Sequence, residues 1–238
     1  MTAADDRVCL LDALPDAVRV MGDAEIERAR GQLMAPVLVR QEGDWGEPVE
    51  EIFDPLAMGL LVTDGLLARD VRLGATRTTE LIGRGDVLRP PELDGGEPTF
   101  PEGIEFAVLE EARMAILDRE VTAAVCRFQP VVTSLVTAAA RRSFGLAELL
   151  ALSHLRRVDS RLIVLFWQLA YRFGRVGADG VSVPLRLTHE TLGRVVGAQR
   201  PSVTTALNQL EAEGRLSRRQ GGGWLLHGEP PEDLERMR

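Results

Sequence analysis

One short segment, residues 196–211, combines side chains able to form hydrogen bonds with a narrow apolar stripe. Numbered as a helix at 100° per residue, the segment has an apolar face made of Val203, Ala206, Leu207 and Leu210. The opposite face and its flanks carry Arg200, Pro201, Ser202, Thr204, Thr205, Asn208 and Gln209. A merely solvated face usually carries Glu and Lys, whereas this one is short and almost uncharged. The pattern predicts a helix that packs on a small core and lies against a polar partner.

The segments on either side predict the elements that position this helix. In "LTHETLGRVVG", Thr188 is the expected N-cap, with Thr191 in the first turn, and Gly197 allows a tight turn. Downstream, "GRLSRRQGGGWLLHG" predicts two strands joined by a tip at residues 221–223. A helix, a glycine turn, a second helix and a two-stranded wing make a winged helix-turn-helix.

Charge is distributed unevenly along the chain. The net charge is −8 for 238 residues, and residues 1–60 hold the acidic excess. Residues 186–227 instead contain six arginines and three glutamates. Because a local basic patch decides nucleic-acid binding, the acidic total does not exclude such a partner.

The first half of the chain predicts a different architecture. Residues 1–35 have the pattern of short helices, and short β-like runs follow them. We expect hairpins at Asp64-Gly65 and Glu110-Glu111, a turn at "GRGD", a long loop over residues 89–103, and a helix from Asp118 to Cys126. Many short strands at regular spacing predict an antiparallel roll or barrel.

A long helix is predicted over residues 130–156. Its apolar stripe consists of Val132, Leu135, Val136, Ala139, Leu146, Leu149 and Leu150. One small roll cannot cover a stripe of this length, so a symmetric partner helix is the simplest cover and these residues are expected to dimerise. The alternative is packing along the helix's own domain. After this helix we expect a break at residues 158–160, then an apolar helix over 160–173, and then a linker or hairpin.

The predicted fold class is therefore α+β, with an N-terminal antiparallel β-roll. The predicted domains are the roll (1–129), a dimerisation helix (130–157) and a winged helix-turn-helix (158–238).

Two cysteines, Cys9 and Cys126, are too few for a metal cluster or a disulfide framework, and we expect two buried thiols. No apolar run approaches the ~20 residues of a membrane span, and no signal peptide is visible. We expect a cytoplasmic protein with no metal, no cofactor and no membrane partner.

These features together resemble the CRP/FNR family of bacterial transcription regulators. The resemblance covers "GRGDVL" at 83–88, the helix at 130–156, a hinge at Val158-Asp159 and "LTHETLGRVVGAQRPSVTTALNQLEAEGRLSRR". It implies a cupin-like, cyclic-nucleotide-binding-like roll that senses a small molecule, a helix that dimerises, and a second motif helix that enters the DNA major groove. The implied partners are an operator DNA, a second copy of the chain and RNA polymerase.

The resemblance also implies which residues bind DNA. Arg200 matches the arginine that the family uses on guanine, whose O6 and N7 suit a guanidinium. Pro201 stands where many members have Glu, and Thr205 where Arg is common. The full predicted set is Thr188, Thr191, Gln199, Arg200, Pro201, Ser202, Thr204, Thr205, Asn208, Arg218 and Arg219. For Arg218 and Arg219 the alternative is a solvated hairpin.

The sensor departs from the family pattern. Cyclic-nucleotide-binding members have a short helix followed by Arg-Ser or Arg-Thr, whereas residues 89–103 contain only Arg89 and no such pair. The leading prediction is a non-enzymatic regulator with an altered or degenerate effector pocket and an unidentified effector. Alternatives are a cyclic-nucleotide-responsive regulator and, in another class, a cupin-like enzyme or docking module with a vestigial winged helix. His154, His189 and His227 lie outside the roll, which weakens a metal-dependent cupin.

Overall fold

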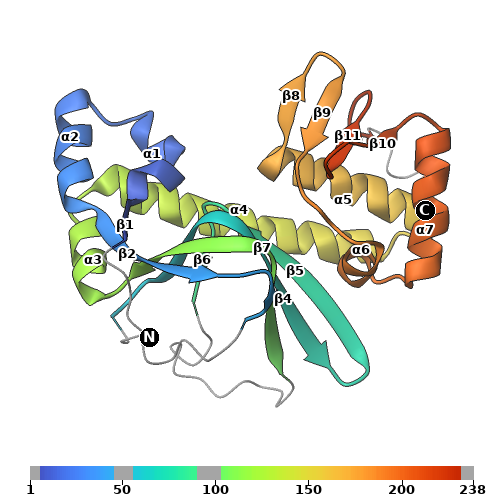
Figure 1. The fold of residues 1–238 in the computed structure, drawn as a ribbon, viewed down its shortest axis with the longest axis horizontal. Helices are drawn as coiled ribbons and strands as arrows, with labels where there is room; N and C mark the ends of the chain where they lie inside the picture. The colour runs from blue at the N-terminus through green and yellow to red at the C-terminus, as the bar shows by residue number, and fades with distance from the viewer. Residues whose placement is uncertain (1–5, 46–55, 90–102, 232–238) are drawn as a thin grey trace. The chain divides into compact units, whose positions relative to one another are not determined.

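The computed structural model describes residues 6–45, 56–89 and 103–231 (Figure 1). The chain divides into two compact units, one formed by residues 1–69 and 81–143 and the other by residues 70–80 and 144–238. Both units combine helices with strands, and the predicted α+β class is confirmed.

An antiparallel sheet dominates the first unit. Its described strands are β1 (Arg7–Cys9), β2 (Met34–Arg40), β3 (Gly43–Asp44), β4 (Gly59–Leu73), β5 (Thr76–Gly83), β6 (Val87–Leu88) and β7 (Ile104–Leu117). They pair in the order β1-β2-β7-β4-β5, with β3 also on β7 and β6 on β4. The register between β2 and β7 places Val37 opposite Ala115 and Arg40 opposite Ala112.

Short helices accompany this sheet. They are η1 (Leu10–Ala13), α1 (Pro15–Val18), α2 (Asp23–Gln32) and α3 (Arg119–Val125), followed by the long α4 (Gln129–Ser153). The Asp118 carboxylate accepts a 2.8 Å hydrogen bond from the Val121 N–H, so the predicted cap of α3 is confirmed. Leu10, Leu33 and Val131 belong to the buried cluster that joins the helices to the sheet.

The predicted turn at residues 83–86 is confirmed, and its sequence explains it. The Asp86 carboxylate accepts from the Gly83 N–H at 2.9 Å, and the Asp86 N–H donates back to the Gly83 carbonyl at 3.0 Å. Gly85, at φ +88°, donates its N–H to the Val62 carbonyl at 2.8 Å. The turn is therefore tied to β4.

Two predicted hairpins are wrong, because both segments lie inside long strands. Gly65 is within β4, where a Cβ would come 2.1 Å from the Glu111 carbonyl oxygen, so its glycine serves a close approach of backbones and not a turn. Glu110 and Glu111 lie within β7, and Glu111 accepts a 2.8 Å hydrogen bond from Gln41. The predicted loop over residues 89–103 lies outside the described residues except at its two ends.

The prediction of two buried thiols is half wrong. Cys9 is buried, but Cys126 is exposed at the end of α3. Both cysteines are free.

Helices and a small sheet also make up the described part of the second unit. Its elements after α4 are α5 (Val158–Phe173), β8 (Arg175–Gly177), β9 (Gly180–Val183), α6 (His189–Val196), α7 (Arg200–Ala212), β10 (Leu216–Arg218) and β11 (Trp224–Leu226). The strands pair in the order β10-β11-β9-β8, so both the predicted wing and the hairpin after α5 are present. Phe166 and Trp224 are buried, with ring centroids 4.9 Å apart, and anchor the sheet on α5.

The tip of the β4–β5 hairpin also belongs to this unit. Asp70 is buried there, accepting hydrogen bonds from Arg77 at 2.5 Å and from the Thr79 hydroxyl, with an Arg194 nitrogen 3.4 Å away. Burial alone would raise the pKa of Asp70, but these donors and the arginine charges hold it below its usual value.

Candidate DNA-binding and dimerisation surfaces

The turn between α6 and α7 is fixed by local hydrogen bonds. The Thr188 hydroxyl accepts from the Thr191 N–H at 3.0 Å, as predicted for an N-cap. Gly197 ends α6 in the left-handed conformation, at φ +65°, and the Ala198 N–H donates to the Gly193 carbonyl at 2.8 Å. These bonds set the direction in which α7 leaves the turn.

Helix α7 has the two faces that the sequence predicts. Its buried residues are Val203, Ala206, Leu207 and Leu210. Its exposed residues from the predicted DNA-binding set are Arg200, Pro201, Ser202, Thr205 and Asn208, with Gln199 exposed at the N-cap position. The polar face is therefore available to a partner along more than two turns of the helix.

The two threonines of this helix use their hydroxyl protons locally. Thr205 donates to the Pro201 carbonyl at 3.2 Å, and Thr204 donates to the Arg200 carbonyl at 3.0 Å. Thr205 is exposed and keeps an acceptor oxygen and a methyl group for a partner, whereas Thr204 is half-buried.

Thr191, a residue of the predicted DNA-binding set, is buried. It is 5% exposed, and its hydroxyl oxygen lies 2.9 Å from that of Thr188. Thr191 therefore completes the cap of α6 from inside, while the exposed Thr188 remains at the surface.

The wing presents two arginines, one of which stacks on an aromatic ring. Arg218 in β10 and Arg219 after it are both exposed. The Arg218 guanidinium carbon lies 4.4 Å from the centroid of the Trp224 ring, a stacking that holds the planar group in place.

A histidine that the sequence analysis left outside the set connects these elements. The Arg218 Nη2 lies 2.7 Å from His189 Nε2, and His189 Nδ1 lies 2.9 Å from the Thr204 hydroxyl. Arginine can only donate, so Nε2 accepts, and hydrogen-bond logic assigns the proton to Nδ1. A continuous chain of donors thus runs from the wing through α6 to the Arg200 carbonyl in α7.

The environment of His189 favours this neutral form. Burial lowers the pKa of His189, and the positive charges of Arg218 and Arg200 lower it further, against a smaller opposing effect of Glu211. No sequence pattern marks this residue, because its partners lie 15 and 29 residues away.

Helix α4 carries an exposed apolar stripe. Val136 is 63% exposed, Leu146 39% and Leu150 66%, with Ala139 also exposed. The other three predicted dimerisation residues are less exposed: Leu135 is part of the buried cluster of the first unit, and Val132 and Leu149 are half-buried. The sequence analysis missed Phe144, which is 67% exposed beside the stripe.

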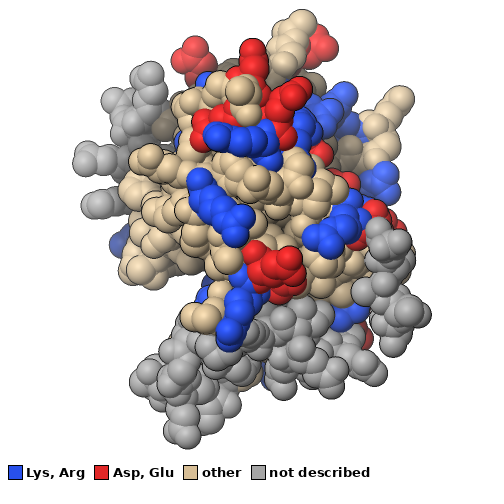
Figure 2. Space-filling model, turned by 90° about the vertical axis from the view of Figure 1, so that its left-hand side faces the viewer, with Lys and Arg blue, Asp and Glu red and all other residues tan. Residues whose placement is uncertain are grey.

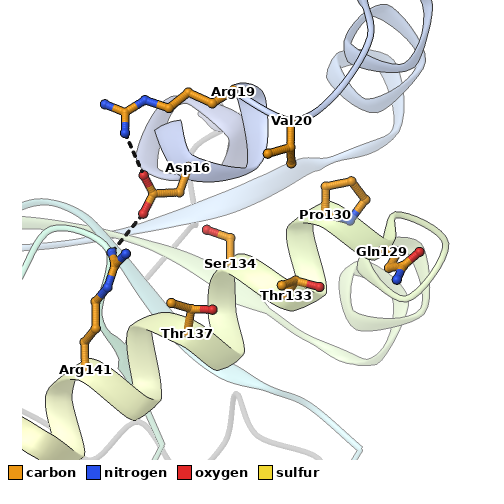
Figure 3. A pocket seen from close by; sticks show the side chains of 9 residues that line it. All are labelled: Asp16, Arg19, Val20, Gln129, Pro130, Thr133, Ser134, Thr137 and Arg141. Atoms are coloured by element: carbon orange, nitrogen blue, oxygen red, sulfur yellow. Dashed lines mark hydrogen bonds and ion pairs between the residues drawn. The ribbon is translucent and has the colours of Figure 1, made fainter.

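The first unit has a groove of about 450 Å³ between α1 and the start of α4. Figure 3 shows Thr133, Ser134 and Thr137 along α4, and Asp16 bridging Arg19 and Arg141 at its rim. The Asp16 distances to these two arginines are 3.2 and 2.8 Å. Elsewhere in this unit, Arg89 donates to the Ala57 carbonyl at 2.5 Å.

Charge on the side of the molecule where α1 and α2 lie is mixed. Figure 2 shows acidic and basic side chains interspersed around an uncharged area.

Within the described parts of the chain, no cluster of three or more His, Cys, Asp or Glu side chains could hold a metal ion. Among these same residues, no single helix has the length and hydropathy needed to cross a bilayer; only α3 and α4 together, bent by 108°, meet that test.

Comparison with known proteins gives a family match within the second unit. Residues 160–236 match the Crp-like helix-turn-helix domain family. The regulatory protein CysR of Synechococcus elongatus is 35% identical over 74 residues, which span 30% of this chain and 36% of CysR. The matched segment is thus about a third of that relative's length.

Solved structures match most of the chain. FixK2 from Bradyrhizobium japonicum is 17% identical with a TM-score of 0.58, covering 85% of this chain and 96% of FixK2. A CRP/FNR-family regulator from Thermus thermophilus is 19% identical with a TM-score of 0.54, covering 80% and 93%. The c-di-GMP-responsive regulator CLP of Xanthomonas campestris is 16% identical with a TM-score of 0.55, covering 86% and 98%. The resemblance to the CRP/FNR family is therefore confirmed: residues 160–236 form a Crp-like helix-turn-helix domain, and the chain has the fold of CRP/FNR transcription regulators.

Proposed function

We propose that the chain is a homodimeric, sequence-specific DNA-binding transcription regulator. The observation that carries the proposal is the exposed polar face of α7 within a Crp-like helix-turn-helix domain. Such a helix enters the major groove with its N-terminal residues against base edges, and here those residues are Arg200, Pro201 and Ser202.

In this arrangement Arg200 reads guanine through O6 and N7. Thr205 offers its methyl group to a thymine, since its hydroxyl proton is used by the Pro201 carbonyl. Pro201 has no N–H and occupies the first turn, where helices have N–H groups without intrahelical partners, so it costs the helix little. Ser202 and Thr188 suit phosphate oxygens, as do the wing arginines.

Dimerisation through α4 follows from its exposed stripe of Val136, Ala139, Leu146 and Leu150. A second copy of the same helix covers such a stripe with an identical one under two-fold symmetry. The dimer would present two α7 helices to one side of a duplex.

In this proposal the N-terminal sensor does not bind a cyclic nucleotide as the cyclic-nucleotide-binding members of the family do, because residues 89–103 lack the Arg-Ser or Arg-Thr pair. Arg89 supports the departure, because its guanidinium bonds a backbone carbonyl. The regulator is inferred to act without catalysis and to contact RNA polymerase, as the family resemblance implies. It responds to an effector other than cyclic AMP, or to none.

Selection from a randomised duplex library, using the full-length protein at two salt concentrations, tests the DNA-binding proposal. We expect two related half-sites about one helical turn, roughly 34–36 Å, apart. Recovery of no preferred sequence at either salt concentration would contradict the proposal.

Light scattering tests the dimer. The double variant Val136→Glu/Leu150→Glu should be monomeric and lose roughly 10²–10⁴-fold in operator affinity, since the second half-site is no longer tethered. Val176→Glu is the matched control, because Val176 is an apolar residue of β8 that is 88% exposed. A double variant that remains dimeric would exclude this interface.

A further inference from the structure

We propose that the groove of the first unit, between α1 and the first turns of α4, binds a small hydroxylated monocarboxylate such as a sugar acid. The inference goes beyond the proposed function, and every residue that carries it belongs to the first unit. The groove volume of about 450 Å³ lies within the range of roughly 300–1,000 Å³ that small-molecule sites occupy. Its lining combines polar groups, a positive charge and a little apolar surface, and each of these selects one part of the ligand.

A ladder of polar side chains forms the α4 wall of the groove. Gln129, Thr133 and Thr137 recur every four residues and so lie along one side of the helix, with Ser134 beside them (Figure 3). Helical threonines can donate their hydroxyl proton to a carbonyl one turn earlier, as Thr204 does in α7. Among the residues that the structure describes, none of the four groove side chains has a hydrogen-bond partner. They therefore keep their donors and acceptors for a ligand.

This wall selects a ligand with several hydroxyl groups. A hydroxyl both donates and accepts, so a polyol chain can pair with three protein hydroxyls and one amide and leave none of them unsatisfied. An apolar ligand of the same size would shield these groups from water without replacing their hydrogen bonds, which is unfavourable.

An ion-paired cluster at the rim sets the charge of the ligand. Asp16 accepts hydrogen bonds from Arg19 at 3.2 Å and from Arg141 at 2.8 Å, and these three are the charged residues of the described lining (Figure 3). One carboxylate between two guanidinium groups leaves a net positive charge. Each arginine uses its Nη1 on Asp16, so other N–H groups remain for a second carboxylate. The balance of charge favours a monoanion.

The apolar part of the lining is small. Val20, which follows α1, is 72% exposed, and Figure 3 shows it on the α1 side of the groove with Pro130 on the α4 side. The C–H groups of a short carbon chain can pack between these two side chains while its hydroxyls reach the polar wall. A hydroxylated monocarboxylate therefore meets all three requirements at once.

Isothermal titration calorimetry of the full-length protein tests this site with three probes at equal ionic strength. D-gluconate carries hydroxyls and a carboxylate, D-sorbitol carries only hydroxyls, and hexanoate carries a carboxylate on an apolar chain. Gluconate should bind saturably, with a single site on each chain. Sorbitol and hexanoate should each bind at least about tenfold more weakly, because the first lacks the charge-assisted hydrogen bonds and the second lacks the hydroxyl pairs.

Substitutions in α4 then assign the binding to the groove. Thr137→Val removes a hydroxyl at nearly constant volume and Ser134→Ala removes another, so each should weaken gluconate binding about 3–10-fold. Arg141→Gln removes one cation and should weaken it by about tenfold or more. Ser143→Ala is the matched control and should bind as the wild type does, because Ser143 is an exposed serine of the same helix outside the groove lining. Thermal unfolding of each variant checks that the first unit remains folded.

Three results would overturn the site: no saturable binding of gluconate by the wild type, equal affinity for hexanoate and gluconate, or an affinity unchanged in both Thr137→Val and Ser134→Ala. Tighter binding of the dianion D-glucose 6-phosphate than of gluconate would overturn the charge assignment. The titration contains no DNA, so the proposed DNA binding and the proposed groove ligand can each fail alone.

Discussion

The recognition helix and the wing of the same unit present opposite kinds of surface. The exposed face of α7 carries one cation, Arg200, followed by neutral side chains as far as Gln209. The wing region gathers Arg186, Arg218 and Arg219 around a glycine tip. Base edges are distinguished by the pattern of donors, acceptors and methyl groups, whereas phosphates attract any well-placed positive charge. The difference indicates a division of labour, with sequence preference in α7 and sequence-independent affinity in the wing.

The two surfaces are nevertheless built on one support. Trp224 packs on Phe166 in α5 and carries Arg218 on its ring. His189 then ties Arg218 to Thr204 of α7. Substitutions in this shared support of Trp224 and Phe166 should weaken both surfaces. Substitutions in one surface should leave the other surface unchanged.

Loss of the support should have the largest effect. Trp224 is 1% exposed, so Trp224→Ala should lower the free energy of unfolding of this unit by about 3–5 kcal/mol. Chemical denaturation followed by circular dichroism measures this. Tyr171→Ala, at an 82% exposed aromatic residue of α5, should change it by less than about 0.5 kcal/mol. Equal effects of the two variants would show that Trp224 is not the shared support.

Local sequence signals explain why the helix-turn-helix could be predicted. A threonine cap, a left-handed glycine and an apolar stripe act within a few residues of one another, and Thr188, Gly197 and Val203 all take their predicted places. The GRGD turn is equally local, since Asp86 bonds the N–H of Gly83 three residues away.

Features that depend on distant partners could not be predicted. Gly65 follows an aspartate between apolar runs, which is typical of a hairpin, yet its glycine is required by the backbone of Glu111 in another strand. The role of His189 depends on Arg218 and Thr204, which only the folded chain brings together. Leu135 and Leu149 share the apolar character of the α4 stripe, but their own chain buries the first and half-buries the second.

Removing Arg200, the single cation of α7, should distinguish the base-reading role of α7 from the role of the wing most clearly. Arg200→Ala should cost about 1–3 kcal/mol on the selected operator and relax the preference at one base pair of each half-site, because the guanine loses its paired donors. Binding to the operator library measures both quantities. If affinity fell evenly across the library with every base preference retained, Arg200 would be a phosphate contact and the division of labour would fail.

Wing substitutions should give the converse result. Arg219→Gln should weaken operator and scrambled duplex alike, leave base preferences unchanged, and reduce the salt slope by about one unit for each phosphate that the arginine no longer neutralises. Arg218→Gln should do the same. A change in base preference in either variant would place the wing arginine against a base edge and break the proposed separation.

The smallest expected effect concerns the link between the two surfaces, through the charge of His189. Burial and the neighbouring Arg218 and Arg200 hold the pKa of His189 below 6.5, with Glu211 opposing them. The unfolded chain, with a histidine pKa near 6.5, therefore binds more protons as the pH falls through this range, and the folded state is favoured at higher pH. The stabilisation is complete above the unfolded pKa and is lost as the pH falls through the folded one. Between about pH 7.5 and 5.5 the unfolding free energy of the wild type should decrease more than that of His189→Gln, which cannot titrate there. Urea denaturation across this range measures the difference. If the unfolding free energies of the two proteins depended equally on pH, the His189 imidazole would not be held neutral beside Arg218.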